Sequence, residues 1–209
     1  MDFAAARKVM VDSQVRVNDV TDRTLQAALL AVPRERFCAP GRAFTAYGEV
    51  EVEIANGRRL MQAREVAKLI QALDARPGET GLAIAAPYAA AVLTKMGLKV
   101  TAQESDGAVM EVVAPALAEA GVSAAVAPLA QPAGEGYDVI VSEGAVAVRP
   151  DAWLAALKTG GRLAVVERPG QNGRAVLYVK GESGLSRREL FDAAPPRLEE
   201  MTPAPTFAL

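Results

Sequence analysis

Glu104 has the position in this sequence that is most suggestive of ligand binding. It follows the apolar run 98–102, which predicts a buried strand, and it lies about 20 residues after Ala85, where the preceding apolar run ends. In a doubly wound parallel sheet, an acid at about that separation binds the ribose hydroxyls of a nucleotide. The alternative is that Glu104 only caps the following helix, together with Ser105 and Asp106. The residues alone leave both interpretations open.

The turn before that strand, Ala85-Ala86-Pro87, is poorly suited to hold a nucleotide. Such a turn needs glycines, because its backbone adopts positive φ and approaches the ligand without a Cβ. Alanine at positive φ costs about 1 kcal/mol or more, and proline has no N–H to donate. No glycine lies between Gly81 and Gly97. The sequence therefore predicts a weak cofactor loop beside a well-placed acid.

Three other groups of residues are candidates for chemistry. Arg58 and Arg59 have the charge to hold a carboxylate, although solvated loop arginines are the more common case. The alternating carboxylates of residues 49–53 predict a solvated strand face rather than a cation site, because like charges on one face are tolerated best in water. Cys38 is the single cysteine, and we expect a small buried hydrophobe rather than a nucleophile.

The composition excludes several classes of function. The absence of histidine removes the imidazole base, His-centred triads and His ligands for zinc or iron, and one cysteine allows neither a disulfide nor a thiolate cluster. We expect no metal. A net charge of −2 argues against a non-specific nucleic-acid binder. The charged N-terminal stretch predicts neither a signal peptide nor a membrane span, and we expect a cytoplasmic protein.

Hydrophobic periodicity predicts the elements that carry these residues. Residues 21–32 predict an amphipathic helix that ends at Pro33, residues 49–54 a half-buried strand, and residues 62–73 a second helix. Beyond them, short apolar runs alternate with helical segments, which is typical of a mostly parallel, doubly wound sheet. The predicted strands are 81–85, 98–102, 122–127, 137–142, 162–166 and 175–179, and the predicted helices are 88–96, 108–120 and 150–158.

Several segments resemble the protein-L-isoaspartate (D-aspartate) O-methyltransferase family, in particular its alphaproteobacterial branch. They are MVDSQVRVNDVTD (10–22), AVPRERF (31–37), YDVIVSEGAV (137–146), LKTGGRLAVV (157–166), GRAVLY (173–178) and FDAAPP (191–196). VPRERF is fairly specific to the family, whereas the GGRL turn occurs in many methyltransferases. The resemblance implies a class I S-adenosylmethionine-dependent fold: α/β, with a doubly wound, mostly parallel seven-stranded sheet. It implies an N-terminal helical extension, residues 1–60, over a Rossmann-like methyltransferase domain, residues 61–209.

The resemblance also implies S-adenosylmethionine as cofactor and isoaspartyl-containing proteins or peptides as substrates. The family's first motif, which reads like VLDVGAGTGY, corresponds to GLAIAAPY here, with a loop about two residues shorter. The cofactor-binding positions would be Ala83, Ala85, Ala86 and Tyr88, and Glu104 matches the family's ribose-binding acid. We therefore expect S-adenosylmethionine to bind weakly or not at all.

The acceptor side departs from the family as well. The segment GQTISQP corresponds to residues 57–63, which places Met61 at the serine position and makes Arg58 and Arg59 possible acceptor contacts. Methyl transfer from a sulfonium needs positioning rather than a histidine, so an isoaspartyl methyltransferase of weak or lost activity is one hypothesis. The alternative is a non-catalytic binding or interaction protein on the same fold. A nicotinamide-dinucleotide protein fits less well, because it needs the missing glycines even more. The oligomeric state cannot be predicted.

Overall fold

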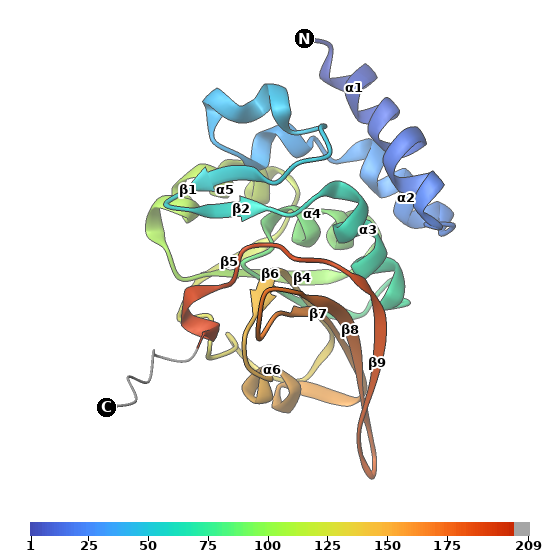
Figure 1. Ribbon diagram of the computed structural model, residues 1–209, viewed down its shortest axis with the longest axis vertical. Helices are drawn as coiled ribbons and strands as arrows, with labels where there is room; N and C mark the ends of the chain where they lie inside the picture. The colour runs from blue at the N-terminus through green and yellow to red at the C-terminus, as the bar shows by residue number, and fades with distance from the viewer. Residues whose placement is uncertain (203–209) are drawn as a thin grey trace.

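The computed structural model describes residues 1–202 and contains a seven-stranded sheet in the order β5-β4-β3-β6-β7-β8-β9 (Figure 1). The first five strands in that order are parallel, and β8 and β9 add an antiparallel hairpin. The bounds are β3 Thr80–Ile84, β4 Lys99–Glu104, β5 Ser123–Val126, β6 Tyr137–Val146, β7 Leu157–Glu167, β8 Arg174–Gly181 and β9 Gly184–Asp192. The predicted fold class is confirmed.

The apolar runs became strands because helices cover both faces of the sheet. In β6, Val139 and Val141 belong to one buried cluster and Ile140 to the other. α3 (Ala63–Ala72), α4 (Pro87–Lys95) and α5 (Gly107–Glu119) lie on the first side, and α6 (Asp151–Ala155) lies on the second, where Trp153 is buried. This arrangement places the carboxyl ends of the parallel strands at one edge, which is where ligands bind in such sheets.

The structure shortens one predicted helix and contains a strand, β9, that was not predicted. The predicted helix at 150–158 ends at Ala155, because Leu157 already begins β7, which pairs Tyr137 with Leu157. β9 was not predicted, because it is largely exposed and carries Arg187, Arg188 and Glu189, so no apolar run marks it. A charged strand at a sheet edge resists pairing with other chains.

The N-terminal residues form α1 (Phe3–Met10), short helical turns (Val11–Val15 and Arg16–Asn18) and α2 (Arg23–Ala31). Asp22 caps α2 by accepting hydrogen bonds from the Thr24 and Leu25 amides. Two 3₁₀ turns (Arg34–Phe37 and Pro40–Thr45) lead to the hairpin of β1 (Val52–Ala55) and β2 (Arg58–Leu60). Figure 1 shows these N-terminal elements over α3, α4 and α5, on the side away from the sheet. After β9, a last 3₁₀ turn spans Glu199–Met201.

The alternating carboxylates do not gather into a cation site. The strand predicted at 49–54 begins only at Val52, as β1. The Glu49 carboxylate lies 3.7 Å from the Arg64 guanidinium, and the Glu53 carboxylate lies 3.7 Å from the Arg42 guanidinium. Within residues 1–202 no cluster of acidic or cysteine side chains has the arrangement of a metal site. In the same part of the chain, no helix combines the length and the apolar character needed to cross a membrane.

Candidate functional site

The carboxyl ends of β3, β4 and β6 meet beside the β1–β2 hairpin. β3 leads into the turn Ala85–Ala86 and α4, β4 ends at Glu104, and β6 passes through Glu143. Arg58 follows the hairpin turn, in which Gly57 has a φ of +79°. Residues distant in sequence therefore converge at the edge where a ligand is expected.

Arg58 makes a two-point ion pair with Glu104. Arg58 Nε lies 2.9 Å from Oε2 of Glu104, and Nη2 lies 2.9 Å from Oε1. The two side chains are only 16% and 4% exposed. Oε1 of Glu104 also accepts hydrogen bonds from the amides of Ser105 (2.8 Å) and Asp106 (3.1 Å). Both oxygens of this carboxylate thus already accept hydrogen bonds from the protein itself, several on Oε1 and one on Oε2.

This pair answers two questions that the sequence left open. Arg58 is not a solvated loop arginine, whereas Arg59 is exposed. The cap of α5 is Asp106, whose Oδ1 accepts from the amides of Ala108 and Val109. Glu104 instead holds the turn before the helix and the hairpin beside it.

The turn between β3 and α4 is closed by its own side chains. Ala85 has a φ of +51°, in the left-handed region that favours glycine, and its amide donates to the Gln103 carbonyl at 2.8 Å. Ala83, Ala85, Ala86 and Tyr88 are all buried. Ala85 thus keeps the glycine-like backbone of the family's loop with a buried methyl group, at a cost of about 1 kcal/mol for that conformation.

Glu143 places a second carboxylate at this edge. It is buried, Oε1 accepts from the Ala89 amide (3.0 Å), and Oε2 accepts from the Met61 amide (3.1 Å). Burial raises the pKa of the Glu143 carboxyl, against the charge of Arg34 and these two hydrogen bonds. Because Ala89 is in the first turn of α4, Glu143 occupies the helix N-terminus that binds anions in related folds. Sequence reasoning missed Glu143, although a carboxylate that interrupts the apolar run of β6 was a visible signal.

Arg34 links these groups from the N-terminal side. It is fully buried, its Nε donates to the Ala46 carbonyl at 2.9 Å, and its Nη2 donates to the Met61 carbonyl. Its guanidinium carbon lies 4.7 Å from the centroid of the Tyr88 ring, a cation–π arrangement. Nη1 of Arg34 and the Tyr88 hydroxyl have no hydrogen-bond partner within residues 1–202. Arg34, the first arginine of VPRERF, is therefore a buried cation, a role that the sequence did not reveal.

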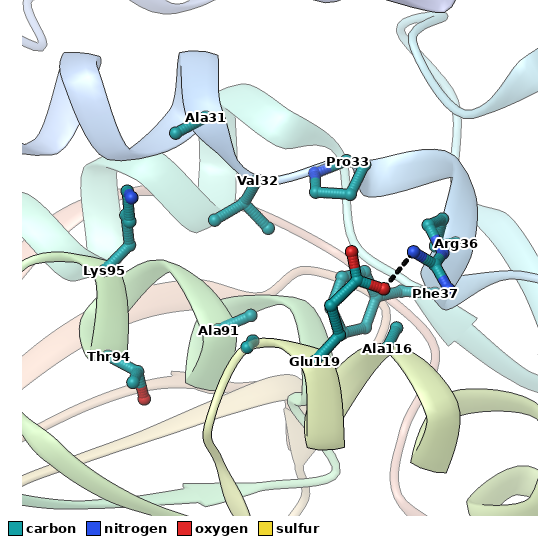
Figure 2. A pocket seen from close by; sticks show the side chains of 11 residues that line it. Ala31, Val32, Pro33, Arg36, Phe37, Ala91, Thr94, Lys95, Ala116 and Glu119 are labelled. Atoms are coloured by element: carbon teal, nitrogen blue, oxygen red, sulfur yellow. Dashed lines mark hydrogen bonds and ion pairs between the residues drawn. The ribbon is translucent and has the colours of Figure 1, made fainter.

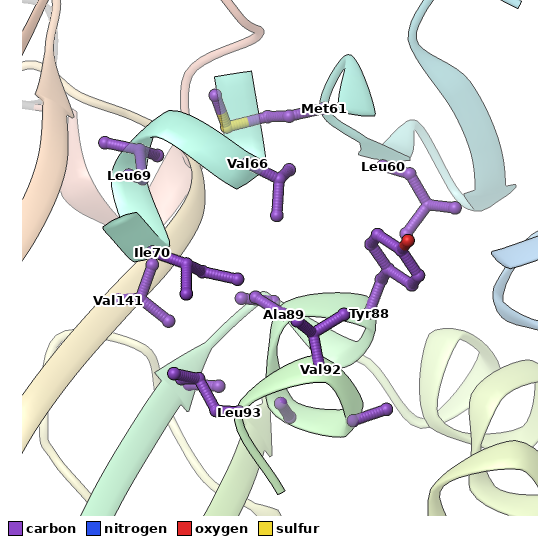
Figure 3. Close-up of a cluster of buried hydrophobic side chains, with 14 of the residues drawn as sticks. Leu60, Met61, Val66, Leu69, Ile70, Tyr88, Ala89, Val92, Leu93 and Val141 are labelled. Carbon is purple, nitrogen blue, oxygen red and sulfur yellow. The ribbon is translucent and has the colours of Figure 1, made fainter. Parts of the chain in front are cut away.

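Met61 faces the interior. Figure 3 shows it with Leu60, Val66 and Tyr88 around the space between α3 and α4, and it is 1% exposed. A thioether in this position cannot donate a hydrogen bond to an acceptor carboxylate, whereas the serine of the family pattern can.

The segment 195–198 covers the same edge. The amide of Leu198 donates to the Ala145 carbonyl (2.8 Å), and the amide of Ala145 donates to the Pro196 carbonyl (2.9 Å). Leu198 packs so tightly that a Cβ on Gly144 would lie 2.6 Å from its Cδ2. The hollow that remains between 57–61, 143–144 and 195–198 measures about 20 Å³, enough for about one water molecule.

A larger hollow of about 360 Å³ lies elsewhere, between residues 31–37 and the ends of α4 and α5. Figure 2 shows Arg36 and Glu119 facing each other there as an ion pair. None of the predicted site residues lines it. Cys38 is buried as predicted, and burial raises the pKa of its thiol, so it is not an activated nucleophile.

Comparisons with known proteins connect this geometry to a family. No family model matches the chain. The chain is 34% identical over 200 residues to a protein-L-isoaspartate O-methyltransferase of Methylorubrum extorquens, covering 93% of this chain and 87% of the relative. It is 33% identical over 197 residues to the protein of the same name from Methylorubrum populi, with 91% and 92% covered.

Solved structures agree in fold. A protein-L-isoaspartate O-methyltransferase superposes with a TM-score of 0.77 at 18% identity, over 95% of this chain and 66% of that one, so the chain spans just under two thirds of its length. A putative protein-L-isoaspartate O-methyltransferase from Plasmodium falciparum, in complex with S-adenosyl-L-homocysteine, superposes with a TM-score of 0.79 at 14% identity, over 96% and 99%.

Proposed function

This chain belongs to the protein-L-isoaspartate O-methyltransferase family, and we propose that it is a non-catalytic member: a binding or interaction protein that keeps the fold but has lost methyl transfer. The observation that carries the proposal is the Arg58–Glu104 pair. In it, the chain's own guanidinium takes the acid that the family pattern assigns to the ribose of S-adenosylmethionine.

The residues at this edge do not fit S-adenosylmethionine. Glu143 holds the amides of Ala89 and Met61, which an anionic group of a ligand would otherwise contact. Ala85 and Pro87, both buried, stand where the family's loop has glycines. The protein's own groups thus occupy Glu104, the N-terminus of α4 and the loop after β3. Changes at all three places support loss of cofactor binding rather than drift at one position.

A weakly active methyltransferase is the second candidate, because Glu104 itself is retained. It would require the β1–β2 hairpin to withdraw Arg58, after which S-adenosylmethionine and an isoaspartyl peptide would be the ligands that the family implies. In both cases we propose that residues 1–60 serve as a cap over residues 61–209, and the cytoplasmic location stays a prediction.

A methyl-transfer assay separates the two candidates. With isotope-labelled S-adenosylmethionine and an isoaspartyl peptide, we expect no more than about 0.1% of the rate given by the Methylorubrum extorquens relative under the same conditions. This factor of 1,000 corresponds to about 4 kcal/mol of lost transition-state stabilisation. A rate between about 0.1% and 10% of that of the relative would support the weakly active methyltransferase instead. A rate within tenfold of that relative would show that the edge opens readily and that the chain is an ordinary enzyme.

A further inference from the structure

A third hollow, of about 760 Å³, lies on the β7–β9 side of the sheet, beside the first turn of α3. Its charged lining consists of Glu65, Glu167, Arg174, Arg187 and Asp192. Three of these residues are neighbours across paired strands. Glu167 of β7 is opposite Arg174 of β8, and Arg174 is opposite Asp192 of β9. The hollow is separate from the closed edge, and no comparison and no family motif quoted above assigns it a ligand.

Glu65 is the unusual member of this lining. Its side chain makes no ion pair or hydrogen bond within residues 1–202, and Oε2 is fully enclosed without a partner, although the residue is only 8% exposed. Burial raises the pKa of the Glu65 carboxyl, because the charged form loses hydration. A buried carboxyl without a partner costs free energy, and such groups are normally hydrogen-bonded or paired.

The cations near Glu65 all have other partners. Arg64 lies 3.7 Å from Glu49, and the Lys68 ammonium lies 4.5 Å from the centroid of the Phe191 ring. Arg174 pairs with Asp192 at 2.8 Å, and Arg187 pairs with Glu167 at 2.7 Å. The two guanidinium groups of the lining thus pair with Asp192 and Glu167 and not with Glu65, on which Arg64 and Lys68 act only through their charge.

The position of Glu65 in α3 does not account for it. Glu65 is the third residue of α3, where a glutamate can reach back to the amide of the residue before the helix. Its side chain makes no such bond, and only its own amide contributes, donating to the Gln62 carbonyl at 3.0 Å. The carboxyl instead borders the hollow between α3 and the β7–β9 strands.

We propose that this hollow binds a primary ammonium group, which pairs with Oε1, the oxygen of the Glu65 carboxylate that is not enclosed. An ammonium is small, carries three donors and matches one unpaired carboxylate. The volume is in the range of small-molecule sites and accommodates an alkyl chain behind the ammonium. A lysine side chain of a peptide and a free polyamine carry the same group. The proposal does not depend on whether methyl transfer is lost.

Titration calorimetry with two probes tests this site and distinguishes the sources. The probes are spermidine and the peptide acetyl-Gly-Lys-Gly-amide, with acetyl-Gly-norleucine-Gly-amide as the uncharged control. We expect at least one amine to bind with a dissociation constant below about 1 mM and the control peptide not to bind. Glu65→Gln should weaken that binding at least tenfold, because the amide keeps the shape and removes the charge. Glu182→Gln, which removes one exposed carboxylate outside the hollow, should leave it unchanged.

A second measurement does not depend on the variant. The carboxyl carbon of Glu65, observed by nuclear magnetic resonance in the unaltered protein, should shift on addition of the amine that binds. Tighter binding of the peptide than of spermidine would identify a lysine side chain as the source, and the reverse order would identify a free polyamine. Absence of binding by both amines up to about 10 mM, equal affinity in Glu65→Gln, or a Glu65 resonance that does not move would each overturn the proposal.

Discussion

Opening the closed edge should restore binding of S-adenosylmethionine. The variant combines Arg58→Ala, Glu143→Ala and a full-length glycine-rich loop in place of Ala85-Ala86-Pro87. It removes the Arg58 guanidinium from both oxygens of Glu104, leaves the Ser105 and Asp106 amides on Oε1, and releases the amides of Ala89 and Met61. A hydrogen bond to a charged group contributes about 1.5–3 kcal/mol, so two ribose hydroxyls on Glu104 suffice for a large gain. We expect a dissociation constant in the micromolar range by titration calorimetry.

The control for this variant is built on the same background. Adding Glu104→Ala should weaken the restored binding at least tenfold, or about 1.4 kcal/mol. The loop exchange with Arg58 and Glu143 left in place should bind no cofactor, because the acid and the helix N-terminus stay occupied. Ala83 takes the place of the acid in the family's VLDVGAGTGY motif. It is left unchanged, because it is fully buried between β4 and β6 and a carboxylate there would be unpaired. A folded triple variant without affinity would mean that other contacts close the site.

Arg34→Met should destabilise the protein by about 2–6 kcal/mol, because two buried carbonyls each lose their donor at a cost of about 1–3 kcal/mol. The substitution leaves the carbonyls of Ala46 and Met61 without a donor. It also removes the positive charge that favours ionised Glu143, whose pKa burial already raises. The free energy of unfolding in urea measures the effect.

Arg36→Met is the matched control, because Arg36 pairs with Glu119 in an exposed position and exposed pairs contribute about 0–1 kcal/mol. In a double-mutant cycle, Arg34→Met and Glu143→Gln should show a coupling free energy of about 1–3 kcal/mol. A loss below 1 kcal/mol for Arg34→Met, equal to the control, would show that Arg34 does not organise the interior.

The sequence predicts those parts of the fold that follow from local pattern. Runs such as Val139-Ile140-Val141 predict strands buried on both faces, and their order along the chain predicts a parallel sheet. Asp22 and Pro33 mark the ends of α2 because capping and helix termination depend on neighbouring residues. β9 could not be found in this way, since its exposed, charged residues carry no burial pattern.

The site could be predicted only in part, because its closure depends on contacts between distant residues. Glu104 and Arg58 were each recognised as candidates, but they lie 46 residues apart and nothing local pairs them. Ala85 was expected to strain a turn that needs glycine, and its positive φ agrees. The partners of Glu143 come from the β2–α3 connection and from α4, so its role becomes visible only when the sheet brings them together.

Titration calorimetry of the unaltered protein with S-adenosylmethionine and S-adenosylhomocysteine tests the central claim most directly. The closed edge predicts no binding heat for either ligand up to about 1 mM, a limit that corresponds to about 4 kcal/mol of binding free energy. The variant with the opened edge, titrated under the same conditions, shows that the method detects binding on this fold. A micromolar dissociation constant for either ligand in the unaltered protein would contradict the account, because it would mean that Arg58 leaves Glu104 and that the edge opens at little cost.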